Sequence, residues 1–553
     1  MAEKCYIIGV GGTGVRVARA LIHLCDCGHI DVKDKEIKVL IIDSDENNGN
    51  KRELEEALKS YSERREDFNP DGNYPLFKTK LTAAVGTNKW SVSPVKEKKR
   101  NVEGELEEMS LEEYIKSEEV KGKDKDLNLM KALYSKKEYS KFKITQGFYA
   151  HPAIGALTFE RWLNTDADFQ NFLKRLKETL LTDASVKVFI VGSVFGGTGA
   201  SGLPAVARKI RAHAGKKLIM AAGVFMPYFI FSSRVSADIG EEERERIKAR
   251  VEIDFAGFTK AAKSALKFYK DTPSLGFNQI YALGASEDDS VRIVRNKHCP
   301  EGGEQNNWPH MLELFGALAV KDFFDRSFDV DKTISQWVGI GVKKDSFSKI
   351  EWKDLPCSKG LKEKINAFLL LSYLFVPSFL NRFINSKDGD LKEGVLRVFK
   401  DCDFMPLKVP PFASKPLLGA GSWRSDFDAE KGKLVNLNEY FITHADWFRR
   451  LLHDFDEENK LIFTGLLGDG YVINQKVKLP WNVYDMKTNG RVELGEKMTK
   501  GSTEAVKKFT HRNANDTIYQ GLKSDYKRLD VNEAISLVLS DLYNGAKECF
   551  DNR

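Results

Sequence analysis

Residues 187–202 read KVFIVGSVFGGTGASG, and this stretch decides the fold. Its first half, 187–194, is an apolar run with the length and composition of a buried β-strand. A glycine-rich turn follows at 195–202, and LPAVARKIRAHA at 203–214 has the pattern of a helix. A turn of this kind lets backbone N–H groups approach a phosphate, and the helix N-terminus adds partial positive charge there. The stretch therefore predicts a phosphate-binding turn.

The start of the chain carries the same pattern. CYIIGV at 5–10 is an apolar strand, GGTG at 11–14 a glycine turn, VRVARALIHL at 15–24 an amphipathic helix and IKVLIID at 37–43 a second strand. Strand, helix and strand in this order predict a βαβ unit with parallel strands. Two glycine turns on neighbouring strands can hold one polyphosphate from two sides, whereas a Rossmann domain has one such turn. The Walker pattern GxxxxGK[ST] is absent, which argues against an ordinary P-loop NTPase.

Composition limits the class of protein. The chain has 553 residues and is 42% hydrophobic, which predicts several domains with sizeable cores rather than disorder. Its 86 Lys and Arg against 80 Asp and Glu leave a net charge of +6, without the concentrated basic excess of a nucleic-acid binder. The longest apolar run, 367–380, is too short to span a bilayer. We expect a cytoplasmic protein that binds no nucleic acid and has no membrane span.

The cysteines predict neither a disulfide framework nor a metal site. Seven are scattered along the chain and none forms a CxxC pair. One segment, HLCDCGH at 23–29, gathers two histidines and two cysteines. A helix there would point these four side chains in different directions, whereas a metal needs converging ligands. We therefore predict no metal site among protein side chains.

Five segments, in order along the chain, resemble segments of the tubulin/FtsZ superfamily. They are IIGVGGTGVRV at 7–17, IIDSDE at 41–46, GFYAHPAIGA at 147–156, VFGGTGASGLPAVA at 194–207 and VFMPYFIF at 224–231. The resemblance is to the family's first phosphate loop, the strand ending in N-T-D, the loop that closes over the terminal phosphate, the signature glycine loop and the strand that follows it.

The resemblance implies the fold. We expect an α/β protein with a tubulin/FtsZ-like, doubly wound nucleotide-binding domain over residues 1–330 and a central helix near 306–324. Within it, 46–142 is rich in Lys and Glu and is expected to be a charged, partly helical insertion. Residues 331–553 are expected to form a second domain and a mostly helical C-terminal region.

The resemblance also implies a site for GTP and Mg²⁺. The glycine loops would donate N–H groups to the β- and γ-phosphates, and an aspartate after the second strand would lie near Mg²⁺. The implied binding residues are Gly11, Gly12, Thr13, Gly14, Asp43, Asp45, His151, Pro152, Gly196, Gly197, Thr198, Gly199, Ser201 and Asn307. Two simpler interpretations stay open: the aspartates end a strand in a turn, and Asn306 or Asn307 caps the central helix.

Hydrolysis is less well supported than binding. The family's activating loop, N-x-D-x-x-D/E, follows the central helix and completes the site of the next subunit in a polymer. Asp329 and Asp331 lie at about the right place and are the catalytic candidates, but Ile334 stands where the third acid belongs. Phe231 stands where the family has an acid that holds the ribose.

These observations predict a divergent prokaryotic tubulin-like protein. It binds GTP, self-assembles under nucleotide control and is a candidate GTPase. An alternative is a nucleotide-sensing scaffold that does not hydrolyse and that binds partner proteins through 46–142 or its C-terminal helices. A third interpretation is an adenylating enzyme of the ubiquitin-activating type, which leaves the second glycine loop unexplained.

Overall fold

The computed structural model divides the chain into two compact units. Unit 1 comprises Met1–Leu21, Val32–Leu58 and Leu81–Lys344, and unit 2 comprises Ile22–Asp31, Lys59–Lys80 and Asp345–Arg553. The residues that the structure describes are 3–32, 36–45, 48–95, 99–100, 106–107, 109–117, 123–141, 144, 147–148, 151–182, 185–230, 255–284, 291–292, 309–328, 336–341, 357, 359–379, 432–434, 436–444, 447–448, 451 and 531–551.

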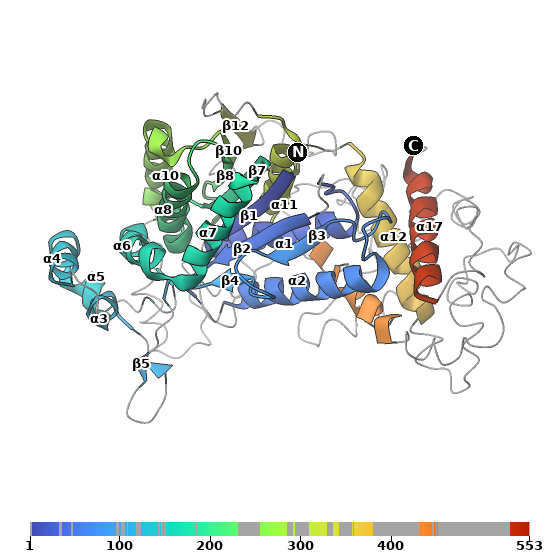
Figure 1. Ribbon diagram of the computed structural model, residues 1–553, viewed down its shortest axis with the longest axis horizontal. Helices are drawn as coiled ribbons and strands as arrows, with labels where there is room; N and C mark the ends of the chain where they lie inside the picture. Colours follow the sequence, from blue (N-terminus) through green and yellow to red (C-terminus); the bar gives the residue numbers. More distant parts are fainter. Residues whose placement is uncertain are drawn as a thin grey trace, which may run out of the picture. The chain divides into compact units, whose positions relative to one another are not determined.

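Unit 1 is built on a largely parallel sheet (Figure 1). Along the sheet the strands follow the order β12-β10-β8-β7-β1-β2-β3, with β4 beside β2. Their bounds are β1 Glu3–Val10, β2 Glu36–Ile42, β3 Lys80–Ala83, β4 Ser91–Val92, β7 Ser185–Ser193, β8 Ile219–Phe225, β10 Gln279–Gly284 and β12 Gln336–Gly341. Ile8 lies opposite Leu40 of β2 and Ile190 of β7, and both pairings are parallel. The predicted α/β fold with a parallel sheet is confirmed.

Helices cover both faces of this sheet. They are α1 Gly11–Asp26, α6 Pro152–Thr165, α7 Ala167–Leu181, α8 Gly197–Ala214, α10 Phe255–Asp271 and α11 Met311–Asp325, with the 3-10 turn η2 at Pro273–Leu275. On one face, Ile8 and Ile190 join a buried cluster with residues of α6, α7 and α8. Successive strand residues point to opposite faces, so Phe189 lies on the other face, where its ring packs 5.8 Å from that of Phe323 in α11.

The helices begin and end where local chemistry dictates. Asp166 caps α7 by accepting a 2.8 Å hydrogen bond from the N–H of Phe169. Helix α8 ends at Gly215, whose φ of +71° is disfavoured for residues with a Cβ. At α11, His310 Nδ1 accepts from the N–H of Leu312, and Glu313 accepts from the N–H of His310. This capping box sets the first residue of the helix at 311.

The predicted charged insertion at 46–142 needs a correction. Two of its segments, β3 and β4, belong to the main sheet rather than to an added surface piece. Helix α2, Gly49–Phe68, buries Leu54 and Leu58 completely, although most of its residues are charged or polar. An apolar stripe at i, i+4 spacing anchors such a helix even when its average composition is polar. The later part carries the short strands β5 Lys99–Arg100 and β6 Leu106–Glu107 and the helices α3 Leu111–Ser117, α4 Lys123–Leu133 and α5 Lys136–Lys141.

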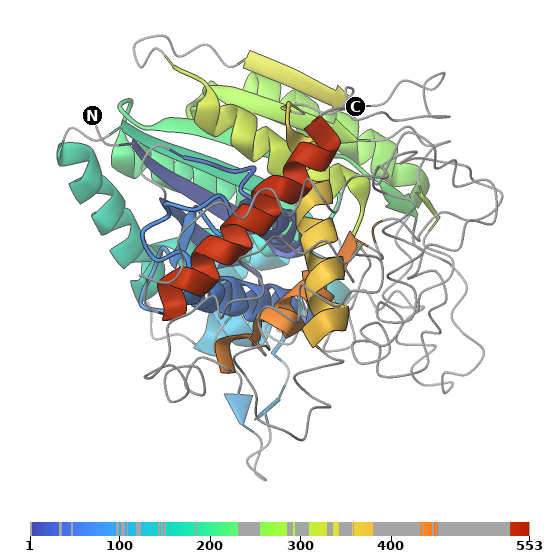
Figure 2. The same ribbon diagram turned by 90° about the vertical axis from the view of Figure 1, so that its right-hand side faces the viewer.

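The described residues of the C-terminal half of the chain are largely helical. Helices α12, Leu361–Phe379, and α17, Val531–Asp551, pack side by side within unit 2 (Figure 2). A strand pair that the sequence predicts near 461–483 lies outside the described residues. Two further short strands, β9 Phe229–Ile230 and β11 Val291–Arg292, pair in parallel. Among the described residues, we find no helix that combines the length and the apolar character needed to cross a bilayer.

Candidate functional site

The two glycine loops lie together at one edge of the sheet. Strands β1 and β7 are parallel neighbours, and each runs directly into a helix, α1 at Gly11 and α8 at Gly197. Strand order reverses between them, because the chain builds the sheet outward from β1 in one direction and from β7 in the other. In doubly wound sheets, ligands bind in the crevice at this point, beyond the carboxyl ends of the strands.

Close backbone packing requires glycine at two positions of the first loop. Gly11 has a φ of +70°, and a Cβ on it would lie 2.9 Å from the backbone N of Gly199. A Cβ on Gly14 would lie 2.7 Å from the carbonyl oxygen of Val191 and 2.6 Å from the carbonyl carbon of Gly9. These are backbone atoms that cannot rotate away, so the residue types at 11 and 14 follow from packing alone.

Gly12 is different. A Cβ added there would meet no described heavy atom within 4 Å. Packing against the described residues therefore does not require glycine at position 12. The open space beside Gly12, in the first turn of α1, is a cradle into which a phosphate oxygen fits.

Hydroxyl groups tie the second loop to the rest of the site. Ser44 Oγ lies 2.9 Å from Thr198 Oγ1, which joins the end of β2 to the first turn of α8. Ser201 Oγ donates a 2.7 Å hydrogen bond to the carbonyl oxygen of Gly197, inside the same helix. Ser44 was not among the predicted site residues, although its position between two predicted aspartates is a signal that could have found it.

Two buried acids lie directly after β2. Asp43 Oδ1 accepts a 3.3 Å hydrogen bond from the N–H of Asp45, and Asp43 Oδ2 is buried with no hydrogen-bond partner in the described part of the chain. Burial and, after it, the carboxylate of Asp45 raise the pKa of Asp43 to about 7, against the opposing effect of Lys51. A buried carboxylate oxygen beside a second carboxylate, next to two phosphate-type loops, fits the hard oxygen ligands that Mg²⁺ takes.

The segment matched to the terminal-phosphate loop packs on the second glycine loop. A Cβ on Gly155 would lie 2.9 Å from Ser201 Cβ, and one on Gly197 would lie 2.6 Å from Phe148 Cβ. His151 occupies the N-cap of α6 without capping it through its side chain, and Pro152 is the exposed first residue of that helix. The structure therefore brings this segment to the predicted site.

A buried polar cluster links the starts of α1 and α11. Arg16 Nη2 lies 2.7 Å from Glu313 Oε1, and Tyr228 Oη donates to the same oxygen at 2.8 Å. Burial raises the pKa of Glu313, while Arg16 opposes that shift. The structure buries the Glu313 carboxylate completely. Sequence reasoning missed Arg16 and Tyr228 as its partners.

The remaining predicted residues are not placed. Asn307, Asp329 and Asp331 lie outside the described residues, as does Phe231. Their roles stay predictions.

Comparison with known proteins identifies the class. Residues 6–247 match a family model described as "Tubulin like". The matched range contains both glycine loops, the two acids after β2 and the segment 147–156. This part of the chain, a little under half of its length, is similar to tubulin-like proteins, which confirms the resemblance to the tubulin/FtsZ superfamily. Comparisons with curated proteins and with solved structures found no match.

The first prediction separates packing glycines from the open one. Gly14→Ala is expected to lower the free energy of unfolding by about 1–3 kcal/mol, because the new methyl group meets rigid backbone. Gly12→Ala is expected to change it by no more than about 0.5 kcal/mol. Denaturant unfolding of both variants without nucleotide measures the difference. Equal destabilisation by the two substitutions would contradict this account of the loops.

The second prediction concerns Asp43 in the absence of nucleotide and divalent cations. Its pKa in the folded protein, about 7, lies above the ordinary 3.8. The stabilising contribution of the neutral form is thus complete below about pH 4 and is lost as the pH rises through about 7. Asp43→Asn, which cannot ionise, is expected to melt higher than the wild type at pH 8 and at nearly the same temperature at pH 4. Thermal melts in EDTA at several pH values measure this.

The exposed Asp271 at the end of α10 offers a matched control. Asp271→Asn is expected to leave the pH dependence of the melting temperature unchanged. A difference between Asp43→Asn and the wild type that is constant across the pH range would refute the assignment to this carboxyl group.

Proposed function

We propose that this protein binds GTP with Mg²⁺ between its two glycine loops and self-assembles under the control of that nucleotide. The observation that carries the proposal is the meeting of the two loops at the point where strand order reverses. Two helix N-termini there direct N–H groups and partial positive charge at one place, which suits a polyphosphate without a Walker lysine. The tubulin-like match over 6–247 supports the same ligand.

Each part of the site has a role in this proposal. The N–H groups of residues 12–14 and 197–199 hold the phosphates. Asp43 and Asp45 hold Mg²⁺, directly or through water, and the buried Oδ2 of Asp43, which has no hydrogen-bond partner among the described residues, supports this role. The bound cation supplies neutralisation of phosphate charge. Segment 147–156, packed on the second loop, closes over the terminal phosphate, and Asn307 contacts the base.

Hydrolysis would depend on two acidic residues whose role is implied by the resemblance to the tubulin/FtsZ superfamily. Asp329 and Asp331 would orient the attacking water in the site of a neighbouring subunit, so turnover would need assembly. The second candidate function is a cytoplasmic scaffold that binds GTP without hydrolysing it. Ile334 and Phe231, which stand where the family has acids, favour this second candidate.

The third prediction tests binding and turnover together. GTP is expected to bind, and the turnover rate per subunit is expected to rise with protein concentration as GTP-dependent polymer becomes pelletable. Turnover and sedimentation are measured on the same samples across a protein dilution series. Tight binding without turnover or pellet would select the scaffold. Preference for ATP with release of pyrophosphate would select the adenylating interpretation, and no binding of either nucleotide would refute the proposal.

Two glycine substitutions, one in the site and one as a control, test where GTP binds. Gly12→Ala fills the open cradle and is expected to weaken GTP affinity by about tenfold or more, equivalent to about 1.4 kcal/mol. Gly86→Ala is the control, because among the described residues a Cβ there meets Lys89 Cβ alone, at 3.8 Å, and Gly86 is not one of the proposed binding residues. Unchanged GTP affinity in Gly12→Ala would place the phosphates elsewhere.

A further inference from the structure

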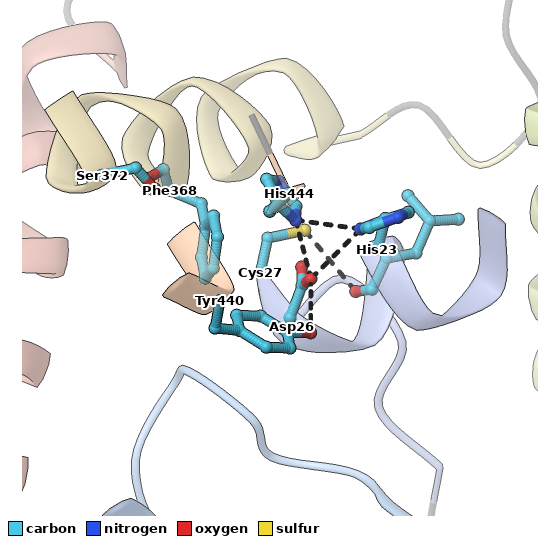
Figure 3. A network of polar contacts seen from close by, with 8 residues as sticks. His23, Asp26, Cys27, Phe368, Ser372, Tyr440 and His444 are labelled. Atoms are coloured by element: carbon cyan, nitrogen blue, oxygen red, sulfur yellow. Dashed lines mark hydrogen bonds and ion pairs between the residues drawn. The ribbon is translucent and has the colours of Figure 1, made fainter. Parts of the chain in front are cut away.

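A second group of titratable side chains is buried within unit 2 (Figure 3). His23 and Asp26 lie one helical turn apart near the end of α1, and His444 comes from the helical residues 436–444. His23 is 3% exposed, Asp26 0% and His444 1%. Three ligand-type atoms, one from each residue, lie within 4.8 Å of one another.

The three atoms form a small triangle. His23 Nδ1 lies 3.0 Å from His444 Nδ1, His444 Nδ1 lies 2.8 Å from Asp26 Oδ2, and His23 Nδ1 lies 3.4 Å from the same oxygen. Tyr440 Oη also donates a hydrogen bond to Asp26 Oδ2, at 3.0 Å. Both imidazole rings thus present the same nitrogen to one carboxylate oxygen.

Hydrogen bonds alone cannot account for all three short distances in this triangle. An imidazole Nδ1 carries either a proton or a lone pair, and a carboxylate oxygen only accepts. If both nitrogens are protonated, the edge between the two histidines joins two donors. If one is protonated, the edge between the other nitrogen and Asp26 joins two lone pairs. One cation at the centre can accept a lone pair from each of the three atoms at once.

We propose that a divalent transition-metal ion of the zinc class binds between His23 Nδ1, His444 Nδ1 and the Asp26 carboxylate. Zinc takes imidazole nitrogen and carboxylate oxygen at about 2.0–2.2 Å, so tetrahedral ligand atoms lie about 3.3 Å apart. The three atoms are 2.8–3.4 Å apart, so an ion at zinc-ligand distance from all three would lie just off the plane of the triangle. Asp26 Oδ1 is buried without a hydrogen-bond partner in the described part of the chain, and it provides a further ligand atom.

The surroundings hold the ligands in place. The hydrogen bond from Tyr440 orients the carboxylate, as outer-shell partners of metal ligands do. The His444 ring packs 4.3 Å from that of Phe368, and the His23 ring packs 4.4 Å from that of Trp447. An enclosed site of this kind suits a structural ion, because a metal that binds only the folded chain adds its binding free energy to stability.

Two neighbouring residues of metal-binding type, His29 and Cys27, have other partners. His29 Nε2 lies 3.1 Å from the carbonyl oxygen of Cys357, and Cys27 Sγ contacts the carbonyl oxygen of Leu24 at 3.5 Å. The set is therefore two nitrogens and a carboxylate, which selects Zn²⁺, Co²⁺ or Ni²⁺ over Cu(I). It uses two residues of the segment 23–29, for which the sequence predicted no metal, and completes them with a distant histidine.

The fourth prediction is metal content. The full-length protein, purified from zinc-supplemented medium and dialysed without chelator, is expected to retain about one metal ion per chain by elemental analysis. Removing it with a strong chelator is expected to lower the melting temperature, and added Zn²⁺ is expected to restore it. Wild-type protein that is folded, free of metal and unchanged in melting temperature by added Zn²⁺ would overturn the proposal.

Two asparagine variants separate a metal site from a hydrogen-bond network. His444→Asn keeps a donor for Asp26 but removes a metal ligand, and it is expected to lower zinc affinity by at least about tenfold. His29→Asn is the matched control, buried in the same segment but outside the triangle, and is expected to keep full metal content. Equal metal content in both variants would mean that the cluster is not the binding site.

A spectroscopic measurement covers the case in which His444→Asn fails to fold. Wild-type protein reconstituted with Co²⁺ is expected to show visible d–d bands without a thiolate-to-cobalt charge-transfer band, because the ligands are nitrogen and oxygen. A strong thiolate band would move the site to the cysteines and overturn the assignment. These readouts are independent of GTP, so their outcome is distinct from that of the proposed function.

Discussion

The close approach of two backbone turns is the constraint on which unit 1 depends. Gly11 and Gly199 lie so near each other that a single added carbon would meet backbone nitrogen. This contact is available only because β1 and β7 are parallel neighbours whose helices start at the same edge. Ser44 and segment 147–156 both pack against the second loop, Ser44 through Thr198 and the segment through Gly197 and Ser201.

The electrostatics of the two buried sites follow one rule. Removing a carboxylate from water is costly unless a positive group or hydrogen-bond donors replace the water. At Glu313 the chain supplies its own replacement in Arg16 and Tyr228. At Asp43 and at Asp26 the described residues leave one carboxylate oxygen without a hydrogen bond. The proposed cations at these two places would supply the positive charge that the described residues do not supply to these two oxygens.

Short-range patterns made much of the fold predictable. The glycine turns, the strands before them and Asp43 with Asp45 were identified from neighbouring residues, and the structure gathers them at one sheet edge. Helix α2 was misjudged because its many charges obscure the stripe through Leu54 and Leu58. Contacts between residues far apart in the sequence could not be predicted, because no residue near Arg16 indicates Glu313 as its partner and none near His23 indicates His444. A single sequence records spacing along the chain, and these contacts depend on tertiary packing.

The distance along the chain between His23 and His444 has a consequence for synthesis. The two residues are 421 positions apart. A ribosome adds about 5–20 residues each second, so about 20–80 s separate the translation of one from that of the other. During this interval the end of α1 exists without the residues that later bury it. His23 and Asp26, which are buried in the finished protein and contact His444, therefore lack this partner throughout the interval.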